Sequence, residues 1–177
     1  MFKSSFLTTL LALAAAQVCG ATDNRSVRVP VLLELFTSEG CSSCPPADAL
    51  LMRLDQTQPV NGAQIIVLSE HVDYWNHLGW SDPFSSSQFS ARQEAYGRAF
   101  RVDAYTPQLV IDGSEQFVGS DAGPIQAAIA RAISRPKLAV KIVSAQREGS
   151  EAVVTVSALA GQGDIWIAVA DERDESM

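Results

Sequence analysis

Residues 31–46 read VLLELFTSEGCSSCPP, and this stretch decides which fold to expect. Its first six residues form a nearly continuous apolar run, which is typical of a strand buried on both faces of an α/β sheet. A short polar turn follows, and then two cysteines separated by two residues, Cys41 and Cys44. From Ala47 the apolar residues recur at every third or fourth position, which predicts an amphipathic helix. The cysteine pair is therefore expected at the N-terminus of a helix that follows a buried strand.

A helix N-terminus suits thiol chemistry, because its unpaired amide groups and the positive end of its dipole favour a thiolate over a thiol. The thiolate is the species that attacks disulfides. We expect Cys41 at the exposed lip of the helix as the nucleophile. Cys44, one turn further in, is expected to be the buried thiol that resolves the mixed disulfide. A CxxC pair in this context is more specific than the bare motif, which also occurs in zinc sites and in structural disulfides.

The first 21 residues have the pattern of a secretory signal peptide: one basic residue, Lys3, an uncharged apolar stretch from Phe6 to Val18, and a small-residue end. The apolar stretch is shorter than the roughly 20 residues that span a bilayer, which argues against a membrane anchor. A lipid-modified Cys19 is a second alternative, weakened by the bulky residue before it. We therefore expect residues 1–21 to be removed and the protein to be secreted or periplasmic.

The number of cysteines and the net charge limit the classes of function that this protein can have. Three cysteines are encoded, and removal of the signal peptide would leave only Cys41 and Cys44. A bridge across two residues restrains little of the unfolded chain, so the pair is expected to be chemical rather than structural. The formal net charge is -7. This acidity argues against nucleic acid as a partner and, after signal cleavage, against a membrane.

A second buried strand is predicted at residues 65–68, and candidate site residues follow it. In an open parallel sheet the ligand crevice lies beyond the carboxyl ends of the strands. If the two strands are parallel and joined by a right-handed crossover, the segment SEHVDYWNH at 69–77 emerges at the same edge as Cys41. The candidates for the wall of the site are His71, Asp73, Tyr74 and Trp75.

Each candidate also has an ordinary structural alternative. Aromatic residues such as Trp75 more often pack in a core than bind substrate. Histidines such as His71 are more often hydrogen-bonded structural groups than bases or ligands. Asp73 is either a partly buried proton acceptor for Cys44 or a turn or cap residue, and the second interpretation is favoured.

Residues 88–101 carry apolar side chains at helical spacing, which predicts a second amphipathic helix. Its Arg92 is a candidate partner for a carboxylate such as Asp73, and a solvated helix face explains this residue equally well. A hairpin is predicted over residues 109–118, because a short apolar run is followed by an Asp-Gly turn signal and a second run. A further helix is predicted over residues 121–134.

In this order the elements resemble a thioredoxin-like domain: strand, CxxC helix, strand, helix, Thr-Pro, antiparallel hairpin and helix. The resemblance implies an α/β fold with a three-layer arrangement of sheet and flanking helices over residues 28–135. It also implies a cis Thr-Pro bond that faces the cysteine pair, where the backbone of the preceding residue can pair with an extended substrate. The catalytic residues that it assigns are Cys41, Cys44, Thr106 and Pro107.

The sequence motifs resemble more closely a family of secreted bacterial domains of unknown function within that superfamily. This family shares LFTSEGCSSCPPAD, HVDYW and YTPQ. This resemblance covers roughly residues 31–133, and it implies no settled activity. The dipeptide Ser42-Ser43 differs from the pairs that mark reductases, oxidases, isomerases and glutaredoxins. The direction of electron transfer therefore does not follow from the sequence.

Beyond Pro136 the pattern changes to three strand-like runs, at residues 138–143, 152–156 and 165–169. These runs predict an antiparallel β-rich extension over residues 137–177. Three strands alone bury little apolar surface. We therefore hypothesise that this extension is a shortened version of a larger family domain.

These features together predict an exported thiol–disulfide oxidoreductase that needs no cofactor and exchanges with a protein or small-molecule disulfide or dithiol. The alternative is a metal-handling protein in which Cys41, Cys44 and a histidine, His71 or His77, hold copper(I) or zinc. A third interpretation is a non-catalytic binding module whose disulfide never turns over.

Overall fold

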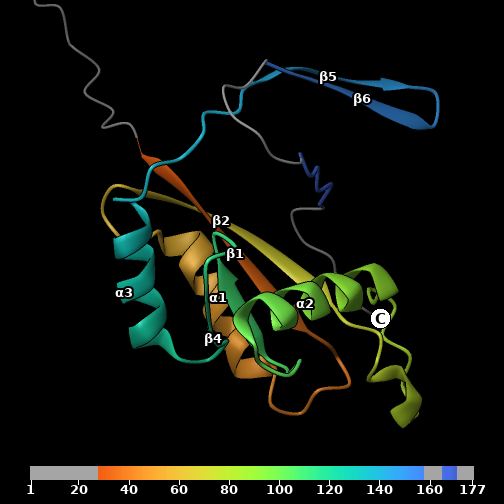
Figure 1. The fold of residues 1–177 in the computed structure, drawn as a ribbon. Helices are drawn as coiled ribbons and strands as arrows, with labels where there is room; N and C mark the ends of the chain where they lie inside the picture. The colour runs from red at the N-terminus through yellow and green to blue at the C-terminus, as the bar shows by residue number, and fades with distance from the viewer. Residues whose placement is uncertain (1–27, 158–164, 171–177) are drawn as a thin grey trace, which may run out of the picture.

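A computed structural model describes residues 28–157 and 165–170 and shows a mixed α/β fold (Figure 1). Its larger part is a four-stranded mixed sheet with the order β2-β1-β3-β4. β1 and β2 are parallel, whereas β3 is antiparallel to both β1 and β4. The strands are β1 (Val29–Thr37), β2 (Ala63–His71), β3 (Gln108–Ile111) and β4 (Glu115–Val118). The helices are α1 (Pro45–Thr57), α2 (Ser87–Phe100) and α3 (Ala122–Ala132), with a 3-10 turn η1 (Asn76–Leu78).

The central strand β1 divides the protein into two packed layers, because successive side chains of a strand point to opposite faces. Leu33 and Leu35 belong to the larger core, which includes buried side chains of α1 and α3. Phe36 belongs to a smaller core with Val110 and the partly buried Tyr96 of α2. Figure 1 accordingly shows α1 and α3 on one face of the sheet and α2 on the other. Both faces of β1 are covered, as its apolar run predicts.

The helix after the cysteine pair forms where its sequence pattern predicts it. Its buried residues are Ala47, Leu50, Leu51 and Leu54, which lie on one face of α1. The helix begins at Pro45, in the first turn, where a missing amide donor costs nothing. It ends at Thr57, and the C-cap residue Gln58 adopts a left-handed conformation with φ 44°. The parallel pairing of β1 with β2 then confirms the predicted crossover through α1.

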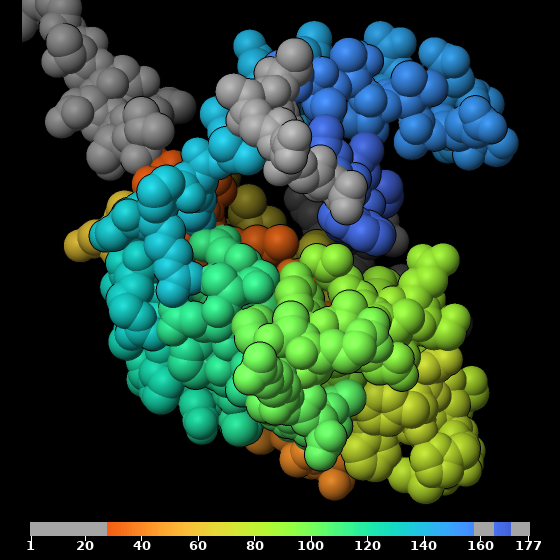
Figure 2. Space-filling model, viewed as in Figure 1, coloured from red at the N-terminus to blue at the C-terminus, as the bar shows by residue number. Residues whose placement is uncertain are grey.

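The C-terminal part differs from the prediction. A separate two-stranded antiparallel sheet is formed by β5 (Ile142–Glu148) and β6 (Glu151–Val156). The strand predicted at 138–143 begins only at Ile142, and the strand predicted at 165–169 is wrong, because residues 165–170 form no strand. Trp166 is 79% exposed, so this apolar run lacks the neighbouring strand and packed face that a ladder requires. In Figure 2 the hairpin lies beyond the layers of the larger sheet.

Parts of two sequence predictions, the signal peptide and the C-terminal extension, lie outside the described residues. The predicted signal peptide, residues 1–21, lies outside them, and so do residues 158–164 and 171–177 of the predicted β-rich extension. Within residues 28–157 and 165–170, no helix has the length and apolarity that crossing a bilayer requires.

Candidate functional site

The cysteine pair occupies the turn between β1 and α1. Cys41 and Cys44 form a disulfide with an S–S distance of 2.15 Å. Cys44 is the N-cap residue of α1, and its carbonyl oxygen accepts hydrogen bonds from the amides of Ala47 and Asp48 at 2.8 and 3.1 Å. The predicted placement of the pair at a helix N-terminus is therefore confirmed.

The burial of the pair is not what the sequence suggested. Cys41 is only 2% exposed and Cys44 is fully buried. The expectation of Cys41 at an exposed lip is wrong, because its Sγ lies 3.3 Å from the Thr106 hydroxyl of a distant loop, and 3.4 Å from the Ser43 hydroxyl. Ser43 itself is exposed. A reacting sulfur can therefore reach Cys41 only when a neighbouring side chain moves.

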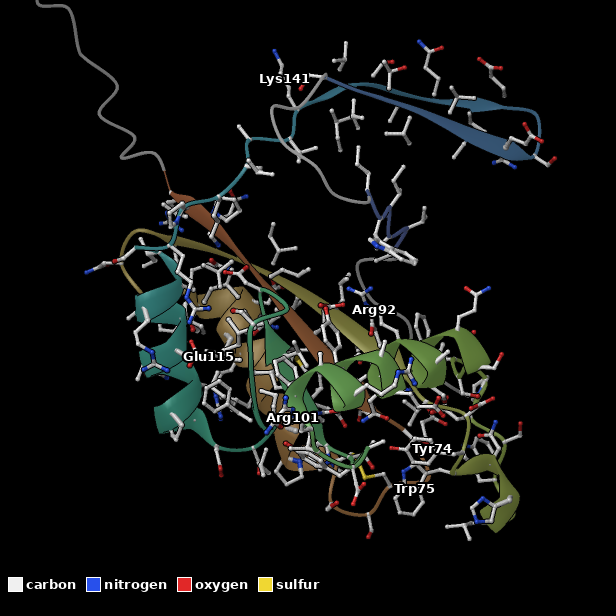
Figure 3. All side chains as sticks on the ribbon, viewed as in Figure 1. Tyr74, Trp75, Arg92, Arg101, Glu115 and Lys141 are labelled. Atoms are coloured by element: carbon white, nitrogen blue, oxygen red, sulfur yellow. A yellow bond between two sulfur atoms is a disulfide. The ribbon has the colours of Figure 1, made fainter. Side chains whose placement is uncertain are left out.

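The loop before β3 brings two further predicted residues to the disulfide. The Thr106–Pro107 peptide bond is cis, the isomer that the family resemblance implies. The Thr106 hydroxyl also accepts a hydrogen bond from the indole Nε1 of Trp75 at 2.8 Å. Figure 3 shows Trp75 next to Tyr74 on the segment that follows β2. Three segments that are distant in sequence, around residues 41, 75 and 106, therefore meet at one sulfur atom.

His71 lies in a hydrogen-bonded network of its own. Its Nδ1 is 2.7 Å from Asp82 Oδ2, and the same carboxylate oxygen accepts the amide of Glu39 at 2.9 Å. Burial raises the pKa of Asp82, but the hydrogen bonds from Glu39 and His71 outweigh burial and hold this pKa below its usual value. The structural interpretation of His71 accounts for these contacts, since the pair attaches the loop around Asp82 to the turn that precedes the disulfide.

Asp73 and Tyr74 connect this segment to α2. The Asp73 carbonyl oxygen accepts the amide of Asn76 at 3.1 Å in a turn, and its carboxylate accepts a hydrogen bond from Ser90 Oγ of α2 at 2.5 Å. The Tyr74 hydroxyl donates to Gln93 Oε1 at 3.1 Å, and Gln93 Nε2 donates to the Tyr105 carbonyl oxygen at 2.7 Å. Sequence reasoning missed Gln93, whose fully buried amide helps to hold the loop before β3.

Arg92 has a different partner from the one predicted. Its Nε lies 2.5 Å from Glu34 Oε1, so the suggested pairing with Asp73 is wrong. Glu70 Oε1 is 3.7 Å from the same nitrogen, and the Tyr96 hydroxyl donates to Glu34 Oε2 at 2.6 Å. Sequence reasoning missed this cluster, although a glutamate inside an apolar strand is itself a signal, because a buried carboxylate needs a partner.

The cluster makes a prediction for pH dependence. Burial, and then the negative charge of Glu34, raises the pKa of Glu70 from 4.5 to about 7. Between these values the folded protein binds a proton that the unfolded chain releases, so stability should fall as pH rises through this window. The fall is on the order of 2–3 kcal/mol, because one pKa unit corresponds to about 1.4 kcal/mol. Glu70→Gln should flatten this dependence in urea unfolding at pH 5 and pH 8.

The exposed Glu94→Gln of α2 is the matched control, and it should leave the difference between pH 5 and pH 8 unchanged. If Glu70→Gln retained the full difference, another group would be responsible. Glu70 Oε2 is buried without a hydrogen-bond partner among the described side chains, which is consistent with a neutral carboxyl group.

Asp48 is a further acidic residue that sequence reasoning missed. It lies one turn after Cys44 on α1, and its Oδ1 accepts a hydrogen bond from the Thr37 hydroxyl at 2.8 Å. Burial raises the pKa of Asp48, and this effect outweighs the hydrogen bond from Thr37. Its place in the first turn of the predicted helix was the available signal.

The structure does not assemble a metal centre around the histidines. Across the part of the chain that is described, no three His, Cys, Asp or Glu side chains are grouped to hold a metal ion. His77, one of the two histidines suggested for that role, is exposed, and its Nδ1 lies 2.5 Å from the Tyr74 carbonyl oxygen.

Comparisons with known proteins identify the family. A comparison with curated proteins gave no significant match. The crystal structure of a protein from Agrobacterium tumefaciens is similar, with a TM-score of 0.56 and 36% sequence identity. The match covers 72% of this chain and 56% of that one, so this chain spans a little over half of its relative. The family model described as "Protein of unknown function (DUF1223)" matches residues 32–177. The chain therefore belongs to the DUF1223 family.

Proposed function

We propose that this protein is an exported thiol–disulfide oxidoreductase with a thioredoxin-like domain over residues 28–135. The observation that carries the proposal is the 3.3 Å contact between the Thr106 hydroxyl and Cys41 Sγ, which joins residues 65 positions apart. It sets the residue before Pro107 directly against a disulfide at a helix N-terminus. The element order β1-α1-β2-α2-β3-β4-α3 supports the proposal, because it is the succession expected of a thioredoxin-like domain.

The proposed reaction exchanges two electrons between sulfur pairs. Starting from the oxidised protein, one thiolate of a substrate dithiol attacks Cys41 Sγ. The Cys41–Cys44 bond breaks, and Cys44 leaves as a thiolate that takes up a proton. The second substrate thiolate then attacks the substrate sulfur of the mixed disulfide, and Cys41 leaves as a thiolate. The substrate is oxidised to a disulfide and the protein is reduced to a dithiol. The reverse sequence reduces a substrate disulfide.

The surroundings of the two cysteines support an order of attack. Cys41 is bordered by the exposed Ser43, whereas Cys44 is fully buried beneath α1. A substrate sulfur therefore reaches Cys41 by displacing the Ser43 side chain, and Cys44 serves as the resolving thiol. Because displacement is needed, small thiols should react with the oxidised pair faster than bulky ones.

The trapping variant Cys44→Ser tests the proposal. In a Cys19→Ser background, it should accumulate mixed disulfides through Cys41 in cells grown under oxidising conditions, because the resolving thiol is gone. Non-reducing electrophoresis should show heavier bands that disappear on reduction. Cys41→Ser in the same background is the matched control, and it should trap much less because the remaining sulfur is buried. Absence of trapped partners, or equal trapping by both variants, contradicts the proposal.

A second candidate function is a binding module whose disulfide stays closed. The burial of both cysteines favours it, because a structural disulfide needs no access. A redox titration separates the two: the proposed oxidoreductase opens reversibly in glutathione or thioredoxin buffers, whereas the module stays oxidised at strongly reducing potentials. Metal analysis of protein purified without chelator, run in parallel, tests the metal-handling alternative. Stoichiometric copper or zinc that is lost in Cys41→Ser would favour that alternative over both.

A further inference from the structure

Three polar groups form a chain that ends on the sulfur of Cys41. The indole Nε1 of Trp75 lies 2.8 Å from the Thr106 hydroxyl oxygen, and this oxygen lies 3.3 Å from Cys41 Sγ. Trp75 comes from the segment after β2 and Thr106 from the loop before β3. Because both residues are distant from Cys41 in the sequence, the tertiary fold is what brings them to the sulfur.

The direction of these hydrogen bonds follows from the chemistry of the groups. An indole N–H only donates, so the Thr106 oxygen must be the acceptor of the Trp75 bond. The Tyr74 hydroxyl also lies beside the Thr106 hydroxyl, but its own hydrogen is donated to Gln93 Oε1 at 3.1 Å. A threonine hydroxyl has a single hydrogen, and it is directed to Cys41 Sγ. The sulfur of a disulfide accepts weakly. After reduction and ionisation the same sulfur carries a full negative charge, and a hydrogen bond to an ionised group is about twice as strong as a neutral one.

The position of Trp75 is held by its surroundings. The side chain packs against the buried cluster of Phe36, Val72 and Val110. Gly40, the neighbour of Cys41, allows this approach, because a Cβ added there would lie 3.1 Å from the Trp75 Cβ. The indole N–H is therefore presented to Thr106 before any reaction, which is the arrangement that electrostatic stabilisation of a developing charge requires.

The other hydroxyl near the sulfur is not committed in this way. Ser43 Oγ lies 3.4 Å from Cys41 Sγ and 3.5 Å from the Thr106 carbonyl oxygen. Its one hydrogen therefore has two acceptors, and the residue is exposed to competing water. Among the groups that contact the sulfur, the Thr106 hydroxyl is the one whose hydrogen is directed by another residue.

We propose that Trp75 is a positioning residue that orients the Thr106 hydroxyl and so stabilises the Cys41 thiolate in the reduced protein. The inference rests on the proposed function of the cysteine pair, and it adds the means by which that pair is tuned. It also gives a role to a tryptophan that sequence reasoning placed in the wall of the site without assigning its chemistry.

The charged groups around the turn have other partners in the structure. Glu39 accepts the indole Nε1 of Trp80 at 2.7 Å, Asp48 of α1 accepts the Thr37 hydroxyl, and Asp82 of the 79–86 loop is bonded to His71. The substitutions at Trp75 and Thr106 leave these three contacts intact. Differences between the variants therefore report the Trp75–Thr106–Cys41 chain and not the general field of the site.

The test measures the pH at which Cys41 ionises, from the ultraviolet absorbance of the thiolate, which needs no reagent to reach a buried sulfur. The starting protein is Cys19→Ser/Cys44→Ser, in which Cys41 is the single thiol. Thr106→Val should raise the midpoint by about one pH unit, because a hydrogen bond to a charged group is lost. Trp75→Phe, which keeps an aromatic ring, should raise it by about half as much.

Three comparisons make the result specific. Trp80→Phe removes an indole N–H that binds Glu39 and not Thr106, so its effect measures the contribution of the Glu39 charge and should be smaller than that of Trp75→Phe. Thr106→Ser keeps the hydroxyl, so its midpoint should lie close to that of the starting protein and well below that of Thr106→Val. In the Thr106→Val background, Trp75→Phe should add nothing, because the two residues act through the same hydrogen bond.

The proposal is overturned if Trp75→Phe leaves the midpoint unchanged in a folded protein, or if Trp80→Phe shifts it equally. It is also overturned if the effects of Trp75→Phe and Thr106→Val simply add. The outcome is separate from that of the trapping experiment. A shifted midpoint without trapped partners would retain the tuning of Cys41 and reject the oxidoreductase, whereas trapped partners with an unchanged midpoint would reject only the role of Trp75.

Discussion

Replacing Arg92 with methionine is expected to lower the free energy of unfolding by about 3 kcal/mol at neutral pH. Arg92 Nε lies 2.5 Å from Glu34 Oε1, and Glu34 is 1% exposed in the central strand. Methionine fills a similar volume but supplies no charge and no donor. The carboxylate of Glu34 would then be buried beside Glu70, with a hydrogen bond from the Tyr96 hydroxyl but without the charge of Arg92, and an uncompensated buried charge is among the costliest single defects.

The measurement is urea unfolding of the wild type and three variants. Arg98→Met is the matched control, because Arg98 lies on the same helix and forms an exposed pair with Glu94 at 3.7 Å. It should cost less than about 1 kcal/mol. Adding Glu34→Gln to Arg92→Met should recover part of the loss, since the buried charge is removed. A loss below about 1 kcal/mol for Arg92→Met would show that Tyr96 alone satisfies Glu34.

Gly119→Ala is expected to destabilise the protein by about 2–3 kcal/mol, because it overfills a closed space. A Cβ at this position would lie 2.7 Å from Leu35 Cδ1, 2.9 Å from Ala47 Cβ and 3.1 Å from Pro107 Cβ. These atoms belong to β1, α1 and the loop before β3, so relieving one contact tightens another. The displaced groups include Ala47, whose amide binds the Cys44 carbonyl oxygen at 2.8 Å, and Pro107, which follows Thr106, so the variant should also change the rate at which the disulfide is reduced.

Gly123→Ala is the control for this substitution. It lies in the first turn of α3, and a Cβ there would meet nothing within 4 Å. Alanine has a higher helix propensity than glycine, but the position precedes Pro124, which disfavours the helical backbone for a residue with a Cβ, so this variant should cost less than about 1 kcal/mol. Thermal unfolding and the rate of disulfide reduction by dithiothreitol compare the two variants directly. Equal stability of Gly119→Ala and Gly123→Ala would mean that the side chains around Gly119 rearrange at little cost, which would contradict this prediction.

Much of the fold was predictable because its signals are local. The apolar run before Cys41, the helical spacing after Ala47 and the Asp-Gly turn after β3 each lie within a few residues, and each produced the predicted element. The run at residues 165–169 shows the limit of this reasoning. Its composition suits a strand, but a strand exists only beside another strand, and pairing is a property of the tertiary structure.

The candidate site was predictable in its residues but not in its contacts. The cysteine pair, Trp75 and Thr106 were all named from motifs, yet no pattern indicated that Trp75 donates to Thr106. The Arg92 partner was misassigned for the same reason, since Glu34 is 58 residues away and its register against α2 depends on how the helix packs.

By itself the sequence determined the order of strands and helices from β1 to α3 and the placement of two cysteines at a helix N-terminus, because periodicity and turn chemistry act between neighbours along the chain. The tertiary structure alone decided that Cys41 is covered, that a threonine hydroxyl contacts its sulfur, and that Glu34 is neutralised by Arg92. Burial and hydrogen bonding at these positions depend on atoms contributed by segments that are distant in sequence, and their approach is set by the packing of the whole domain.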